Sequence, residues 1–132
     1  MAMIALGIYF IFTKKEEAKN PEPDIIVETP KPNDVVSGNF SISGKAKENW
    51  YFEAVFPVRL VDENNNEFAS GQARATSDWT VPDYVPFTGE INFSSSTETT
   101  TTGFVIFKND NPSGDPSRDK EFRVPVTIAP KK

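Results

Sequence analysis

Short runs in which every second residue is apolar constrain this chain more than any other feature. Between Phe40 and Lys47, one face carries apolar or small residues and the other carries Ser and Lys. Such alternation recurs further along, in Phe56, Val58 and Leu60 and in Val124, Val126 and Ile128. Because successive side chains of a β-strand point to opposite faces, each run predicts a strand with one buried face.

Seven candidate strands follow residue 24, and turn residues separate them. They cover residues 25–32, 39–47, 52–62, 67–76, 84–93, 102–109 and 121–129. No segment in this region shows a helical period, and short strands at this spacing are typical of an immunoglobulin-like fold. We therefore expect an all-β protein, an antiparallel β-sandwich of about seven strands at residues 25–129.

Two of the runs make specific predictions about the core. The third places Phe52 on the same buried face as Phe56 and Leu60, and the last places Phe122 with Val124. Pro30 and Pro32 end the first run, and proline also falls inside three later runs, at Pro57, Pro86 and Pro125. Since proline cannot donate a ladder hydrogen bond, we expect each of these last three to mark a sheet edge or a bulge.

The N-terminal end differs in composition from the rest. Residues 1–12 carry no charge, and as a short apolar helix they would reach only about 18 Å, against a hydrocarbon core of ~30 Å. We interpret residues 1–13 as an apolar N-terminal membrane anchor or signal remnant; a short buried strand or helix is the alternative. Residues 14–24 are charged and contain two prolines, which predicts an extended, solvated linker.

Composition excludes several function classes. The chain has no Cys and no His, so disulfides, thiolate chemistry and a Ser-His-Asp triad are absent. No enzyme mechanism and no cofactor is expected from the remaining carboxylates, lysines and tyrosines. The formal net charge is −5, and this argues against binding to nucleic acid, which requires a clustered basic surface.

Several short motifs, in order, resemble a known family. They include Phe56-Pro57-Val58-Arg59-Leu60, Gly71-Gln72-Ala73, Asp78-Trp79 and Lys108-Asn109-Asp110-Asn111-Pro112-Ser113-Gly114. From about Ile25 to Ile128 the chain resembles the Gmad-type immunoglobulin-like domain of bacterial spore germination proteins. The resemblance implies an extracytoplasmic β-sandwich module of envelope proteins, without a known catalytic reaction.

Aromatic residues supply the first candidate contact site. If Phe52 faces the core, Trp50 or Tyr51 must face differently, and one of them could join Trp79 and Tyr84 in a surface patch. The hypothesis is that Tyr51 and Trp79 contact an envelope polymer. Ordinary core packing is the alternative for these aromatics.

Charged and amide residues supply the second. Glu53 and Arg59 are expected on the outer face of one strand, with Glu53 paired across strands to Lys108 or Arg123. Asn111 lies in an oxygen-rich loop, residues 109–119, for which chained turns and a calcium site are both open.

Together these features predict a non-catalytic, membrane-tethered, extracytoplasmic interaction module. Its expected partner is an envelope protein or a cell-wall polymer, and its candidate contact residues are Tyr51, Glu53, Arg59, Trp79, Lys108 and Asn111. A carbohydrate- or peptidoglycan-binding module that uses exposed aromatics is the alternative.

Overall fold

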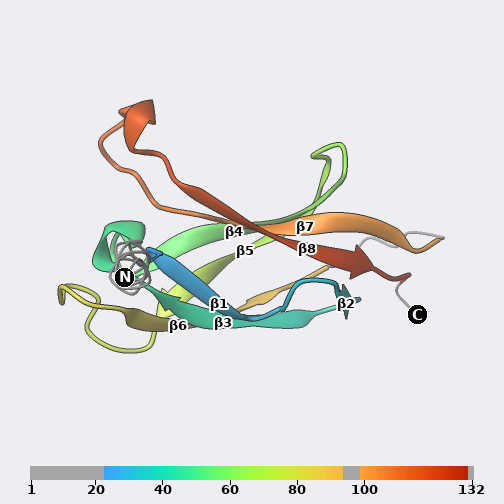
Figure 1. Cartoon of the computed structure of the whole chain (residues 1–132), viewed down its shortest axis with the longest axis horizontal. Coiled ribbons are helices and arrows are strands. Elements are labelled where there is room, and N and C mark those ends of the chain that lie inside the picture. Colours follow the sequence, from blue (N-terminus) through green and yellow to red (C-terminus); the bar gives the residue numbers. More distant parts are fainter. Residues whose placement is uncertain (1–22, 94–98, 131–132) are drawn as a thin grey trace, which may run out of the picture.

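The computed structural model describes residues 23–93 and 99–130 (Figure 1). Its strands are β1 (Ile25–Thr29), β2 (Asp34–Val36), β3 (Phe40–Ala46), β4 (Val55–Asp62), β5 (Glu67–Ala75), β6 (Val85–Ile91), β7 (Thr101–Lys108) and β8 (Glu121–Ile128). Two 3₁₀ turns, η1 (Glu48–Trp50) and η2 (Pro116–Arg118), complete the elements. The predicted anchor at residues 1–13 and most of the predicted linker at 14–24 lie outside the described residues.

The all-β prediction is confirmed, and each of the seven predicted segments overlaps one strand. The strands form one eight-stranded sheet in the order β1-β3-β6-β5-β4-β7-β8-β2. All neighbours pair antiparallel except β2 and β8, which are parallel, so the sheet is mixed. Two separate antiparallel layers are thus not confirmed. The short β2, which the sequence did not reveal, makes the eighth strand.

The connection between β1 and β2 explains why this sheet curls. The two strands lie at opposite ends of the strand order, yet only residues 30–33 separate them. The five residue-to-residue steps from Thr29, the end of β1, to Asp34, the start of β2, span at most about 18 Å. The two ends of the sheet are therefore close together, as the ribbon in Figure 1 shows. The apolar side chains between them form one buried cluster.

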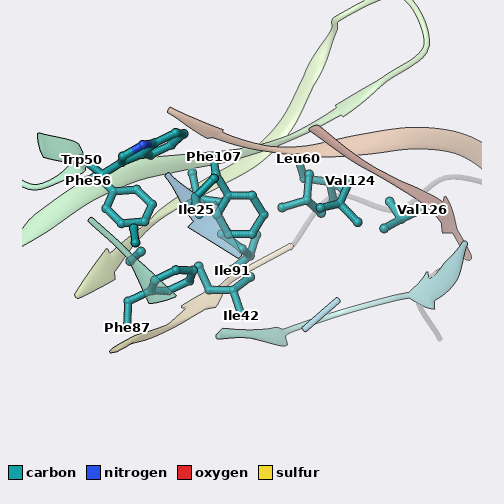
Figure 2. Packing of buried hydrophobic residues seen from close by; sticks show 14 of the residues in the cluster. Ile25, Ile42, Trp50, Phe56, Leu60, Phe87, Ile91, Phe107, Val124 and Val126 are labelled. Carbon is teal, nitrogen blue, oxygen red and sulfur yellow. The ribbon is translucent and has the colours of Figure 1, made fainter. Parts of the chain in front are cut away.

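Aromatic side chains fill one end of the enclosed core. Phe56 is fully buried and meets Phe87 edge to face at 5.1 Å between ring centroids, and Trp50 meets Phe56 in the same way at 5.5 Å. Figure 2 shows these rings at one end and Val124 and Val126 towards the other. Offset and edge-to-face contacts suit the ring quadrupoles, so this end is both apolar and geometrically specific.

The inner faces predicted for the runs are confirmed over most of their length. Ile42, Val58, Leu60, Val124 and Val126 are all buried. Phe122 is the exception in β8, because its side chain remains 40% exposed. It lies where β8 and β1 border an apolar hollow of about 340 Å³ instead of pairing with each other, so no strand covers it.

Pro57 and Pro86 lie in interior strands, so their predicted edge positions are wrong, whereas Pro125 lies where β8 passes from an unpaired edge to its pairing with β2. Each proline nevertheless pairs with one neighbouring strand only, because the ladder on its other side begins at the next residue. The one-sided pairs are Pro57 with Gln72, Pro86 with Lys45, and Pro125 with Phe104. The missing N–H of proline is thereby accommodated.

Candidate functional site

A polar basin of about 500 Å³ lies between η1 and the β7–β8 loop. Amide and aliphatic hydroxyl side chains supply half of its lining residues: Asn49, Asn109, Asn111, Ser113 and Ser117. Asp110, Arg118 and Lys120 add charge, and Tyr51 lies in its wall. The basin therefore offers neutral hydrogen-bond donors and acceptors together with side chains of positive and negative charge.

A local turn sets the η1 side of the basin. Phe52 and Val55 exchange backbone hydrogen bonds of 3.0 and 3.2 Å across a two-residue turn. Glu53 and Ala54 both have positive φ, 53° and 72°, as a type I′ turn requires. The strand β4 therefore begins at Val55, and the alternation read through residues 52–54 does not apply there.

This turn reverses the predicted orientation of the aromatics. Phe52 is 41% exposed, so its predicted place in the core is wrong, whereas Tyr51 is 4% exposed, so its predicted place on the surface is also wrong. The Tyr51 hydroxyl donates to the Val85 carbonyl at 2.6 Å, and its ring meets Phe56 at 5.2 Å. Burial raises the pKa of the Tyr51 phenol well above its usual value, so it remains a neutral donor.

Asn109 organises the opposite side. It is buried, and its amide nitrogen donates to the Arg118 carbonyl at 3.0 Å while its side-chain oxygen accepts from the Lys120 N–H at 2.7 Å. A further backbone bond from Asp110 to the Trp50 carbonyl, 3.0 Å, links this loop to η1. In the sequence, Asn109 appears only as one member of the Lys108–Gly114 motif, an amide at the start of a loop rich in turn residues.

The Asn111 side chain forms hydrogen bonds within the loop at residues 109–119. Its amide nitrogen donates to Asp119 at 2.8 Å and to the Asp115 carbonyl at 2.9 Å, and its oxygen accepts from Ser113. Lys108 lies 3.4 Å from Asp119. The Asn111 hydrogen bond, and then Lys108, holds the pKa of the Asp119 carboxyl below its usual range.

These contacts bear on the calcium alternative. The side-chain oxygens of Asp115 and Asp119 are engaged by Ser117, Asn111 and Lys108. Over the ranges 23–93 and 99–130, no group of three His, Cys, Asp or Glu residues could hold a metal ion. The bonds from the Ser113, Asp115 and Ser117 N–H groups to the side chains two residues earlier are those of the predicted chained turns.

The start of the domain lies at the edge of the basin. Lys120, a lining residue, forms an ion pair with Asp24 at 2.7 Å. The hydrogen bond from Lys120 holds the pKa of Asp24 below its ordinary value, although partial burial opposes this shift. The Tyr84 hydroxyl also donates to the Pro23 carbonyl at 2.6 Å. The segment that enters the domain is thus fastened beside the basin.

The predicted site residues divide into two groups. Tyr51 and Asn111 line the basin. Lys108 does not line it, but pairs with Asp119, whose side chain accepts a hydrogen bond from Asn111. Glu53, Arg59 and Trp79 do not line the basin. Arg59 lies 3.8 Å from Glu67, and Trp79 is half-buried against the core.

The predicted pairing of Glu53 with Lys108 or Arg123 is wrong. Lys108 is next to Asp119, and Arg123 pairs with Glu121 at 2.8 Å. The reason is again the turn at Glu53, which removes that residue from the β4 ladder.

Comparison with known proteins adds the family. Among the described residues, no helix is both long and apolar enough to span a membrane. The chain matches no curated protein and no solved structure. A family model, Gmad2, described as the immunoglobulin-like domain of bacterial spore germination, matches residues 24–115. This range includes every strand except β8. It also includes the basin residues up to Ser113, but not Ser117, Arg118 and Lys120. The chain therefore belongs to the Gmad2 family of immunoglobulin-like domains.

Proposed function

We propose that this chain is a non-catalytic, membrane-tethered, extracytoplasmic interaction module that binds an envelope partner through the polar basin. In this proposal the two halves of the curled sheet act as the layers of an immunoglobulin-like sandwich and hold the loops rigidly. The observation that carries the proposal is the basin itself: a hollow of about 500 Å³ with convergent polar groups on loops above a packed core.

The chemistry of the basin supports binding rather than catalysis. The chain has no His and no Cys, so the commonest general base and the thiol nucleophile are missing. Tyr51 keeps its proton because burial raises its pKa, and Asp119 remains ionised because Asn111 and Lys108 stabilise its charge. Neither group is poised to exchange a proton near neutral pH.

The apolar residues 1–13 and the charged linker support the tether. Asp24 and Lys120 hold the start of the domain at the edge of the basin. Eleven linker residues, 14–24, extend at most about 40 Å. A tethered chain therefore presents its basin close to the membrane, which favours a partner in the envelope.

Fractionation of cells tests the tether. The full chain is expected in the membrane fraction and a variant that lacks residues 1–13 outside it. A protease added to spheroplasts is expected to digest the full chain, since we place the domain outside the cytoplasm. Recovery of both forms in the cytosol would overturn this part of the proposal.

Charge reversal tests the basin. Arg118 lines the basin, so Arg118→Glu is expected to abolish crosslinking to an envelope component that the wild type captures in intact cells. Arg74→Glu, on the exposed face of β5 and outside the basin, is the matched control and is expected to retain capture. Equal capture by both variants would show that the basin is not the contact surface.

A carbohydrate partner is the second candidate, and the amide and hydroxyl lining of the basin favours it. Tyr51 cannot serve as part of an exposed aromatic surface for a carbohydrate, because its ring is buried and its hydroxyl already donates a hydrogen bond to the Val85 carbonyl. Calorimetry with soluble peptidoglycan fragments distinguishes the two candidates. Heat that Arg118→Glu removes and Trp79→Ala retains would assign the basin to a glycan; no heat with the wild type would leave the protein partner.

A further inference from the structure

The first half of β8 has an open edge that the fold leaves available. Two hydrogen bonds fix the direction of its backbone groups. The Lys120 carbonyl accepts from Asn109 on the β7 side, at 3.0 Å, and the Pro125 carbonyl accepts from Asn33 on the opposite side, at 2.7 Å. Because backbone groups of successive strand residues point to alternate sides, even-numbered residues face β7 and odd-numbered residues face away from it.

Glu121 and Arg123 therefore direct their N–H and C=O groups outward. The parallel partner β2 pairs only from Val126 onward, so it does not reach them. Throughout residues 23–93 and 99–130, no hydrogen bond satisfies these outward groups. Exposed strand edges of this kind are templates for another strand. Both side chains are exposed as well, and Phe122 between them is 40% exposed.

The order of charges along this edge is complementary to itself. In an antiparallel pair of two β8 strands with a two-fold axis at Phe122, Glu121 of one copy lies opposite Arg123 of the other, twice. Both are outward-facing residues, so each is a hydrogen-bonded pair that exchanges two N–H···O bonds. A two-fold axis at Glu121 or at Arg123 would instead place like charges opposite each other, which is unfavourable.

We propose that residues 121–123 of β8 form an antiparallel contact with the same residues of a second copy, so that two domains pair edge to edge. The two Phe122 side chains then meet across the axis on the apolar side. Pro125 has no N–H and limits the ladder to this short stretch. The β1 edge is less suited, because Pro23 and Pro30 flank it and it lacks alternating charges. So short a contact predicts a reversible dimer.

Because the chain has no cysteine, a single introduced thiol reports on the contact. Residues at the two-fold axis form a non-hydrogen-bonded pair with Cα atoms ~4.5 Å apart, within the range for a disulfide. We expect the full chain with Phe122→Cys, in detergent micelles under mild oxidation, to form a covalent dimer. Val35→Cys, at a site 67% exposed, is the matched control and is expected to remain monomeric.

Charge reversal in the Phe122→Cys chain distinguishes the proposed register from random collision. Glu121→Arg alone and Arg123→Glu alone place like charges opposite each other and are expected to slow crosslinking. The double reversal restores complementarity and is expected to restore the rate. Circular dichroism checks that each variant retains its β-structure. Equal rates for all variants, or for Phe122→Cys and Val35→Cys, would overturn the proposal.

Other occupants of the edge give different results. If crosslinking appears only after residues 1–13 are removed, the apolar segment of the same chain covers the edge and the proposal is wrong. If the chain with Phe122→Cys remains monomeric at every concentration, both with and without residues 1–13, the edge does not bind a second copy. That result would leave the basin function untouched, because the edge contains none of the residues that line the basin.

Discussion

Phe52 and Phe56 are four residues apart, and their surroundings are opposite. Phe56 is fully buried among Trp50, Tyr51 and Phe87, whereas Phe52 is 41% exposed. The difference arises between them, at the left-handed turn of Glu53 and Ala54. In strand β4 the side chains alternate between the two faces of the sheet, whereas the residues just before it follow the geometry of the turn. An aromatic run therefore contributes to the core or to the surface according to the backbone beneath it.

Truncating the two phenylalanines gives the largest expected contrast. Phe56→Ala is expected to lower the free energy of unfolding by about 3–5 kcal/mol, because it leaves a cavity at the centre of the aromatic cluster. Phe52→Ala, the matched control, is expected to change it by less than about 1 kcal/mol, since half-exposed residues lose little burial. Urea unfolding followed by circular dichroism measures both, and similar losses would remove the basis of the comparison.

The sequence predicted the strands well because alternation depends only on which face is buried. It could not predict the turn, because neither Glu53 nor Ala54 is a residue that usually adopts positive φ. The curl of the sheet was equally hidden, because it depends on β2 pairing with the distant β8 while the neighbouring β1 pairs with β3. Asn111 was found as a member of a polar loop, but the buried role of Asn109 depends on packing.

An intermediate effect on stability is expected in the β7–β8 loop, which faces η1 across the basin. Asn109→Ala removes two side-chain hydrogen bonds and leaves the Lys120 N–H and the Arg118 carbonyl without them. Asn109 is buried and both bonds are partly buried, so we expect a loss of about 1–3 kcal/mol in the free energy of unfolding. Asn64→Ala, at the exposed tip of the β4–β5 hairpin, is the control and is expected to cost less than about 0.5 kcal/mol. Equal losses in thermal unfolding would mean that Asn109 does not hold the basin wall.

The smallest effect on stability is expected at the ion pair between Asp24 and Lys120, where the chain enters the domain. The pKa of Asp24 is lowered in the folded protein, chiefly by its hydrogen bond to Lys120. A lowered pKa stabilises the fold above the ordinary value of about 4, and this contribution is lost as the pH falls through the lower folded value. Exposed pairs contribute only about 0.2–1 kcal/mol. Melting temperatures of wild type and Asp24→Asn are therefore expected to differ slightly at pH 7 and to converge as the pH falls below the lowered pKa of Asp24; a gap that did not narrow with falling pH would argue against the pair.

The most direct test of the account is the reactivity of single thiols placed on either side of the turn. Tyr51→Cys and Phe52→Cys are labelled with a maleimide in the native protein and again in denaturant. The account predicts that the thiol at position 52 reacts nearly as fast as in the unfolded chain and that the thiol at position 51 is strongly protected. Protection at position 52 with free reaction at position 51 would mean that the β4 alternation continues through residues 51–54, and it would contradict both the turn and the basin wall built on it.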